Sequence, residues 1–439
     1  MTPSPKRLST FDATLMVMGG IIGIGIFFTP STVAGRVGSP TAFVGIWALG
    51  GLIAMAAAAT FAEWGASFPK AGGWYVFLRE SFGRLAAFLF AWMVLFVVST
   101  GAIASVSKFA ANAVDQALPH VDLSAWQSAI SAALIVTVTL VCLAGVKSGT
   151  LFQNGIMLIK LGAIATLIFA GLALADPMPL DPALDVELAT PSTGGFFAAL
   201  LPVFFAYGGW QMVCYVAPLV KDPERTLPRA ILFGVGGVIV VYVALAFAYE
   251  RVLGVEGLAA QSDFASVLGR HVFGSAGGSL LSAGLALSAV GWMVVTIFGS
   301  PWLYVAMARE GLFFESFEKL SKAGVPTLGL CLQMGLALLY LTLPLDLLVD
   351  GVVNAEWIFH GLVAAGLLRY RARKPEAPRP FTSPLYPLAP LIYLATAIII
   401  VVTQAKTQIA AEEYLIQGVG LAILVAGGLV YATWAAKRV

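Results

Sequence analysis

The chain alternates long apolar stretches with short polar loops along its whole length. Each stretch is close to the roughly 20 apolar residues that an α-helix needs to cross a bilayer. The pattern therefore predicts an all-α integral membrane protein with twelve spans, and an even number places both termini on one side. The predicted spans cover residues 13–35, 42–67, 84–112, 126–146, 153–175, 195–218, 230–253, 277–307, 327–349, 355–371, 388–405 and 414–436.

The polar segments are too short to hold a separate soluble domain. We therefore predict one membrane domain that begins with a polar tail at residues 1–12, without a removable signal sequence. A core of ten helices covers 13–371. An arginine- and proline-rich connector at 372–387 precedes two further helices at 388–436.

Lysines and arginines gather in the loops on one side of the predicted membrane, as is typical of the cytoplasmic side. We therefore predict a protein of the cytoplasmic (inner) membrane with both termini in the cytoplasm. Glu63 and Lys70, near the inner end of the second span, are interpreted as solvated loop charges. The basic residues that do not lie in the predicted cytoplasmic segments are Lys108 and Lys160 inside spans, and Arg36, Arg251, Arg270 and Lys406 in outer loops.

The composition supports membrane insertion and argues against other classes of protein. Charged residues make up 11% of the chain, against about 25% in soluble domains. A net charge of +2 gives no argument for a nucleic-acid partner. The three cysteines and three histidines form no group with metal-ligand spacing, and the spans offer no nucleophile or paired carboxylates. We therefore expect a protein that is not an enzyme and that has no metal or cofactor.

The first span contains the stretch GGIIGIGIFFTP, in which Gly19, Gly20, Gly23 and Gly25 disfavour a continuous helix. Glycine costs roughly 1 kcal/mol relative to alanine inside a helix. Unpaired backbone at membrane depth is tolerated where it faces protein or a cavity, so an interrupted span indicates a transporter's binding site. The alternative is close helix packing, which the spacing of Gly19 and Gly23 also allows.

The sixth span is interrupted in the same way at the sequence YGG, residues 207–209. Breaks in spans 1 and 6 are expected from an inverted repeat of five plus five helices, with spans 11 and 12 outside it. A half-helix that begins near Gly25 points free N–H groups at an anion. Half-helices that end near Ile22 and Phe205 offer free carbonyls to a cation. The two breaks together suit a zwitterion that carries both charges on one carbon.

Six motifs resemble the amino acid–polyamine–organocation (APC) superfamily, and within it the L-type amino acid transporter (LAT) branch. They are IIGIGIFFTP, AEWGASFPKAGGWYVFLRE, FFAYGGWQ, DPERTLPRAI, YVAMAREGLFF and EWIFHGLVAAGLLRYRARKPEAPRPFTSPLYPLAP. The similarity runs from about Phe11 to Tyr393. It implies a LeuT-like fold and amino acid transport without sodium.

The resemblance also implies the residues of a substrate site. Phe205, with Ala206 beside it, is assigned as an aromatic gate over the substrate, the alternative being a core or lipid-facing aromatic. The carbonyls assigned to the substrate ammonium are those of Ile21, Phe205 and Gly208. The amides assigned to the substrate carboxylate are those around Gly23, Ile24 and Gly25.

Three side chains are further candidates. The resemblance places Lys160 where sodium-coupled relatives hold a cation against the first span, so its ammonium would brace carbonyls near Gly20 and Ile21. A proton carrier and a fixed structural cation are the alternatives for this buried lysine. Trp292 faces either the cavity or the core. Gln211, one turn past the second break, is a candidate polar contact.

The chain departs from the L-type pattern at three places. The sequence GIG at residues 23–25 replaces the usual Gly-Ser-Gly, which changes the expected carboxylate contacts and substrate size. Ala217 and Pro218 stand where an acidic residue usually precedes Asp-Pro-Glu-Arg, so an inner-gate ion pair is not expected there. The outer loop between spans 3 and 4 has no cysteine, so no disulfide-linked glycoprotein subunit is expected. The sequence does not indicate an oligomeric state.

These features predict a sodium-independent transporter that exchanges neutral L-amino acids by alternating access. Neutral substrates are favoured because the candidate cavity residues are apolar or aromatic, with no acid at membrane depth. A proton-coupled symporter that uses Lys160 is one alternative, and an exchanger of cationic amino acids or polyamines is another. A channel or a scaffold fits the hydropathy equally well but does not account for two interrupted spans at matched positions.

Overall fold

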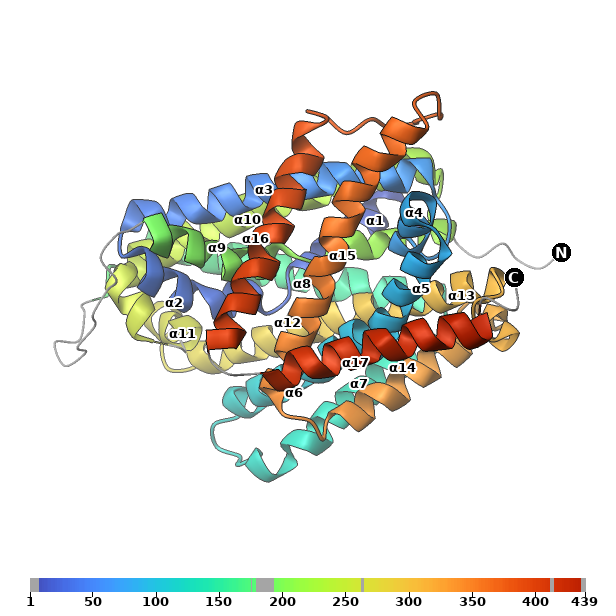
Figure 1. Cartoon of the computed structure of the whole chain (residues 1–439). Helices are drawn as coiled ribbons and strands as arrows, with labels where there is room; N and C mark the ends of the chain where they lie inside the picture. The colour runs from blue at the N-terminus through green and yellow to red at the C-terminus, as the bar shows by residue number, and fades with distance from the viewer. Residues whose placement is uncertain (1–7, 175, 179–192, 262–263, 411–413, 436–439) are drawn as a thin grey trace.

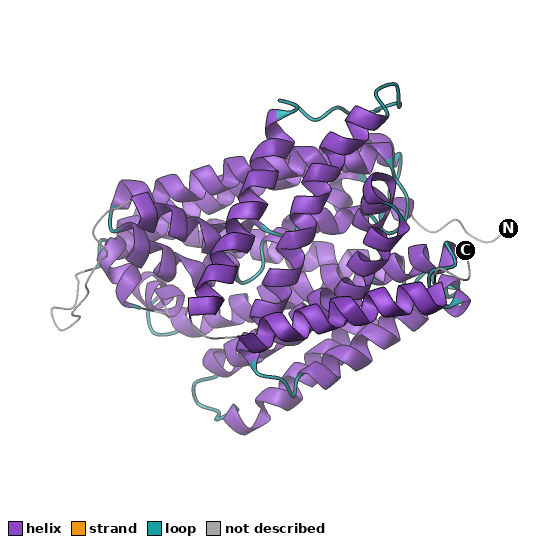
Figure 2. Cartoon of the chain, viewed as in Figure 1, coloured by secondary structure: helices purple, strands orange, loops and turns teal. Residues whose placement is uncertain are grey.

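The computed structural model describes residues 8–174, 176–178, 193–261, 264–410 and 414–435. Within these ranges the ordered elements are helices and no β-strand occurs (Figure 2). Among the described residues, nine helical stretches are long and apolar enough to cross a membrane. The bent pair of α1 (Thr10–Ile21) and α2 (Gly25–Val37) makes a tenth. The predicted all-α membrane fold is therefore confirmed.

The spans follow the predicted order along the chain. The two predicted spans at 327–349 and 414–436 contain shorter apolar helices, α14 (Thr327–Tyr340) and α17 (Tyr414–Val430). The count of twelve and the division into a ten-helix core, a connector and two added helices therefore remain predictions. The other spanning elements are α3 (Pro40–Ser67), α5 (Arg84–Met93) with η1 (Val94–Val98) and α6 (Ser99–Ala117), η2 (Ser124–Trp126) with α7 (Gln127–Leu143), α8 (Val146–Phe169) with η3 (Ala170–Leu174), α9 (Thr193–Tyr207) with η4 (Trp210–Cys214), α10 (Pro223–Ala260), α12 (Gly277–Gly299) with α13 (Pro301–Arg309), α15 (Leu345–Arg373) and α16 (Leu388–Ala410).

The broken first span lies inside the bundle. Helices α3 and α10 run side by side, and α1 packs against α10 while α2 packs against α9 (Figure 1). Helix α15 lies beside α16 and also contacts α6. Four short elements, α4 (Trp74–Phe82), α11 (Phe264–Phe273), η5 (Ala217–Leu219) and η6 (Glu315–Glu318), lie between spans, and η7 (Tyr431–Ala435) follows α17.

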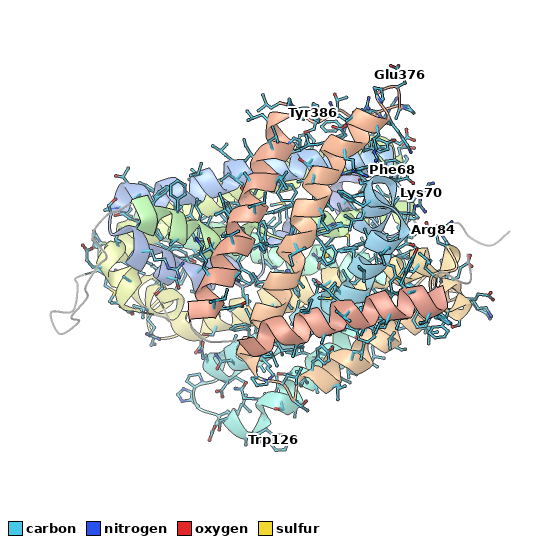
Figure 3. The ribbon with its side chains drawn as sticks, viewed as in Figure 1. Phe68, Lys70, Arg84, Trp126, Glu376 and Tyr386 are labelled. Atoms are coloured by element: carbon cyan, nitrogen blue, oxygen red, sulfur yellow. The ribbon has the colours of Figure 1, made fainter. Side chains whose placement is uncertain are left out.

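The end of the bundle at which α1 begins, the α1 end, is held together by a buried carboxylate. Glu63 is 1% exposed and accepts hydrogen bonds from Arg371 Nε and from the Ser383 amide, both at 2.7 Å. Since an unpaired buried charge is costly, these partners account for its burial. The interpretation of Glu63 as a solvated loop charge is therefore wrong, whereas Lys70 is exposed (Figure 3). The guanidinium of Arg371 also lies 3.7 Å from the ring centroid of Tyr386, which anchors the segment after α15.

A second ionic cluster joins α4 to the segment after α13. Glu310 pairs with Arg79 and accepts a 2.7 Å hydrogen bond from the Tyr75 hydroxyl. Glu80 accepts a hydrogen bond from Arg79 at 2.8 Å. Burial raises the pKa of the Glu80 carboxyl, but the hydrogen bonds and charges of Arg79 and Lys374 together outweigh it, so the net shift is downward. Ion pairs therefore tie this end together at positions other than Ala217 and Pro218.

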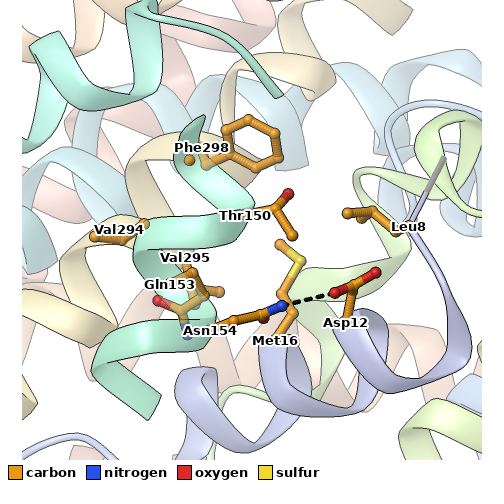
Figure 4. A pocket seen from close by; sticks show the side chains of 10 residues that line it. Leu8, Asp12, Met16, Thr150, Gln153, Asn154, Val294, Val295 and Phe298 are labelled. Carbon is orange, nitrogen blue, oxygen red and sulfur yellow. Dashed lines mark hydrogen bonds between the residues drawn. The ribbon is translucent and has the colours of Figure 1, made fainter. Parts of the chain in front are cut away.

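The beginning of α1 is fixed to α8 by side-chain contacts. Ser9 and Asp12 form a capping box at the first turn of α1. The Asn154 amide then donates a 2.6 Å hydrogen bond to Asp12 Oδ1 (Figure 4). The pocket beside this contact, between α1, α8 and α12, has a volume of about 20 Å³, close to the size of one water molecule.

Candidate functional site

A cavity of about 380 Å³ reaches the middle of the bundle between α2, α6, α9 and α15. This volume is within the usual range for small-molecule sites. The cavity follows α2 away from the α1 end as far as Arg36. Its lining includes the candidate substrate residues Ile21, Gly23, Ile24, Gly25, Phe205, Ala206, Gly208, Gln211 and Trp292.

The first predicted break is present and points unpaired amides at the cavity. Helix α1 ends at Ile21, α2 begins at Gly25, and their axes bend by 43°. The Gly23 amide is already used, because it donates to the Ile21 carbonyl at 2.8 Å. The first amides of an α-helix have no partner inside the helix. At the start of α2, the amides of Ile24, Gly25 and Ile26 have no backbone partner among the described residues.

The second predicted break is present but differs from the prediction on both sides. Helix α9 continues to Tyr207, two residues beyond Phe205. Gly209 then adopts a left-handed conformation with φ of 118°, which glycine tolerates. The chain continues as the 3₁₀ helix η4 rather than as a second α-helical half. Helix α9 therefore ends at the cavity, with its last carbonyls there, and a 3₁₀ helix follows.

Glycine allows the two breaks to touch. A Cβ atom on Gly209 would lie 2.0 Å from the carbonyl oxygen of Gly20. A Cβ on Gly25 would lie 2.6 Å from the Cα of Ala206. These glycines therefore interrupt the helix and also permit close backbone packing, while the interpretation as a binding site stays a prediction.

A tyrosine that sequence reasoning missed bridges the two breaks. The Tyr242 hydroxyl, carried by α10, lies 3.1 Å from the carbonyl oxygens of both Ile21 and Ala206. The Ile21 carbonyl therefore has two partners in this conformation, Tyr242 and the Gly23 amide. A buried tyrosine usually finds a hydrogen-bond partner, and this rule was the available signal for a tyrosine in the middle of a largely apolar span.

Replacing Tyr242 with phenylalanine is expected to slow transport several-fold and to lower the melting temperature by a few degrees. Removing one partner of a buried hydrogen bond costs about 1–3 kcal/mol, and this hydroxyl joins both breaks. The control is Tyr304→Phe, because the buried Tyr304 hydroxyl has no hydrogen-bond partner among the described residues. Equal effects of the two variants on initial uptake rate would contradict a bridging role for Tyr242.

Lys160 lies behind the first break, where it is 3% exposed. Its ammonium donates to the Ile22 carbonyl and, at 3.2 Å, to the Ser288 carbonyl. The Ser288 hydroxyl donates to the Gly23 carbonyl at 2.7 Å. The ammonium thus braces the first break as expected, but at Ile22 rather than at Gly20 and Ile21. No carboxylate among the described residues forms an ion pair with Lys160.

The side chains predicted near the substrate take distinct positions. Phe205 is 44% exposed and lines the cavity rather than closing it. The Trp292 ring approaches the first break, because a Cβ on Gly23 would lie 3.2 Å from its Cδ1. Gln211 accepts from the Gly209 amide at 3.1 Å and donates to Glu356 Oε1 at 3.0 Å. Trp292 therefore faces the cavity, and Gln211 connects the second break to α15.

The prediction that no acid lies at membrane depth is wrong. Glu356 of α15 lines the cavity and its side chain is 25% exposed. His360 follows one turn later, with Nε2 at 3.6 Å from Glu356 Oε1. Two ionisable residues four positions apart in an apolar span were the available signal, because such residues usually face the interior of a bundle.

Comparison with known proteins adds independent information. The model of a family described as amino acid permease matches residues 8–432. The serine/threonine exchanger SteT of Bacillus subtilis is 29% identical over 89% of each chain. The human large neutral amino acids transporter small subunit 2 is 30% identical over 97% of this chain and 80% of its own. The mouse b(0,+)-type amino acid transporter 1 is 28% identical over 94% of this chain and 85% of its own.

Proposed function

Because the chain belongs to the amino acid permease family, we propose that it exchanges neutral L-amino acids across a membrane, without sodium and by alternating access. Two similar proteins, an exchanger of serine and threonine and a transporter of large neutral amino acids, support this substrate class. We place the protein in the cytoplasmic membrane with both termini in the cytoplasm. The absence of a disulfide-linked subunit stays a prediction from the sequence.

The observation that carries the proposal is the meeting of two broken helices at one cavity. The amides of Ile24, Gly25 and Ile26 at the start of α2 would hold the substrate carboxylate, aided by the positive end of the helix dipole. The last carbonyls of α9, including that of Phe205, and the Gly208 carbonyl would hold the substrate ammonium. The Ile21 carbonyl lies within hydrogen-bond distance of the Tyr242 hydroxyl and of the Gly23 amide in this conformation, and it would bind the ammonium when Tyr242 moves.

The shape of the site supports alternating access. The cavity extends along α2 away from the α1 end, whereas the α1 end is tied by Asp12 and Asn154 and by the Arg79–Glu310 pair. We assign this conformation to the state that is open away from the α1 end. Closure of α2 and α9 would then bring the exposed Phe205 ring over the substrate.

Counterflow into proteoliposomes tests exchange. Labelled neutral amino acid is expected to enter vesicles loaded with unlabelled amino acid at least tenfold faster than empty vesicles, and equally with sodium or choline outside. The internal substrate is needed because an exchanger returns across the membrane only when loaded. Uptake that requires sodium, or that is independent of internal substrate, contradicts the proposal.

Proton-coupled symport is the second candidate, and the isolation of the Lys160 ammonium from carboxylates favours it. In that case labelled amino acid would accumulate in empty vesicles when a proton gradient is imposed, acidic outside. Dissipation of the gradient with a protonophore would abolish the accumulation. The same vesicles therefore separate the two mechanisms.

A further inference from the structure

Glu356 offers the cavity a carboxylate oxygen that is not engaged elsewhere. Its Oε1 accepts from Gln211 and lies near His360 Nε2, whereas its Oε2 has no hydrogen-bond partner among the described residues. The side chain is 25% exposed, and Glu356 lines the cavity that the two breaks share. An open acceptor at this depth is an unsatisfied site unless a ligand or water reaches it.

No fixed lysine or arginine of the described part of the chain neutralises this carboxylate. Within the described ranges no lysine or arginine forms an ion pair with Glu356, and His360 is the one basic side chain with a nitrogen within 4 Å of its carboxylate. Arg36 lines the same cavity but its guanidinium donates to the Ala198 carbonyl at 2.7 Å. Because an uncompensated charge away from water is expensive, the geometry favours a cation that arrives with the ligand.

The remaining wall suits an extended side chain with a positive end. Phe28 and Phe109 meet edge to face with centroids 5.7 Å apart, and Trp357 lies next to Glu356 in the lining. Such rings cover methylene groups and attract cations through their faces. The volume of about 380 Å³ leaves room for a long side chain.

Glu356 is also connected to the segment that we assign to the substrate backbone. One Gln211 side chain joins the Gly209 amide to Glu356 Oε1, which holds the carboxylate beside the second break. His360 Nε2 lies 3.6 Å from the same oxygen, Glu356 Oε1, and His360 Nδ1 contacts the Tyr393 hydroxyl. These neighbours engage Oε1, so Oε2 is the oxygen of this cavity-lining residue that is left without a partner among the described residues.

We infer that Glu356 is a specificity-determining residue that binds the cationic end of a basic amino acid, so that the protein accepts arginine-like substrates besides neutral ones. This inference rests on the proposed function, since the backbone of the substrate is held at the two breaks. Gln211 is a positioning residue for this subsite.

The test compares L-arginine with L-citrulline, whose side chain has nearly the same shape but is uncharged. Both compete against a labelled neutral amino acid in counterflow by the full-length protein. Arginine is expected to reach half-inhibition at a concentration at least tenfold below that of citrulline. Glu356→Gln should abolish this preference while changing citrulline inhibition less than twofold. Glu224→Gln, at the exposed start of α10, is the matched control and should keep the preference.

Other outcomes overturn the inference. Equal inhibition by arginine and citrulline in the wild type would contradict the cation subsite. An equal loss of inhibition by both ligands in Glu356→Gln would also contradict it. A preference that survives Glu356→Gln while the pH dependence of exchange disappears assigns Glu356 to proton binding instead. If Glu356→Gln does not fold, Glu356→Asp keeps the charge and should retain a reduced preference for arginine.

A failure of the proposed function has a different signature. If the wild type shows no exchange of any amino acid, thermal stabilisation of the purified protein by the two ligands still tests the subsite. A larger shift with arginine than with citrulline, lost in Glu356→Gln, would support the subsite without the exchange. The absence of such a difference would reject it.

Discussion

Replacing Gly209 with alanine is expected to abolish exchange. The new Cβ would lie 2.0 Å from the Gly20 carbonyl oxygen, and φ of 118° is a conformation that alanine rarely adopts. The contact partner is backbone, so the variant can relieve the clash only by moving α1 away from η4. Because in the proposed site the two breaks hold both substrate charges together, we expect the initial counterflow rate to fall at least 100-fold.

The matched control is Gly162→Ala on the exposed face of α8, where an added Cβ meets nothing within 4 Å. Alanine is favoured over glycine inside a helix by about 1 kcal/mol, so this variant should be at least as stable as the wild type. Both proteins are compared by initial uptake rate and by melting temperature in detergent. Near-normal transport by Gly209→Ala would contradict the close contact on which the site is built.

Local sequence signals were sufficient to predict where both spans are interrupted. Glycine weakens a helix regardless of its tertiary surroundings, so the start of α2 at Gly25 and the interruption at Gly208 and Gly209 were predictable. The hydropathy likewise located the long spans, because length and apolarity decide membrane insertion. What these signals share is that each depends on a short segment of chain.

The errors arose where distant segments meet. The register of α1 on α8 decides that Lys160 reaches Ile22, and spacing along the sequence does not determine that register. The same holds for Tyr242, whose hydroxyl finds two carbonyls from separate helices. Glu63 was misread because its partner Arg371 lies more than 300 positions further along the chain. Glu356 was overlooked because the cavity-facing side of α15 depends on how that helix packs.

The structure also changes how the substrate carboxylate is expected to bind. The family pattern pointed to amides around Gly23, but a short turn between Gly23 and Ile21 consumes the first of them. The available amides therefore begin at Ile24, whose branched side chain replaces the usual serine and partly faces the cavity. In the proposed site, contacts to the carboxylate would then depend on backbone alone, and we propose that Phe205, Trp292 and Glu356 set the range of substrates.

Lys160→Ala is expected to slow exchange at least tenfold while leaving membrane insertion unchanged. The ammonium donates to the Ile22 carbonyl at the end of α1, and a hydrogen bond to a charged group contributes about 1.5–3 kcal/mol. Without it, Ile22 keeps the Ser288 hydroxyl at 3.4 Å, a weak contact. The end of α1 would then sample other positions, which reduces the fraction of molecules with a complete site.

Lys108→Ala provides the control for removing a lysine from a span. The Lys108 ammonium also donates to a carbonyl, that of Leu343 at 2.6 Å, but it does not line the cavity. Exchange should be measured from pH 5 to pH 9 for both variants, with the amount of inserted protein quantified in parallel. If Lys160 braces the break, Lys160→Ala loses activity at every pH and Lys108→Ala does not. If Lys160 carries the coupled proton, the loss is restricted to proton-driven uptake and counterflow persists. Normal transport by Lys160→Ala at every pH would reject both roles, because the amine would then be dispensable to the break that it contacts.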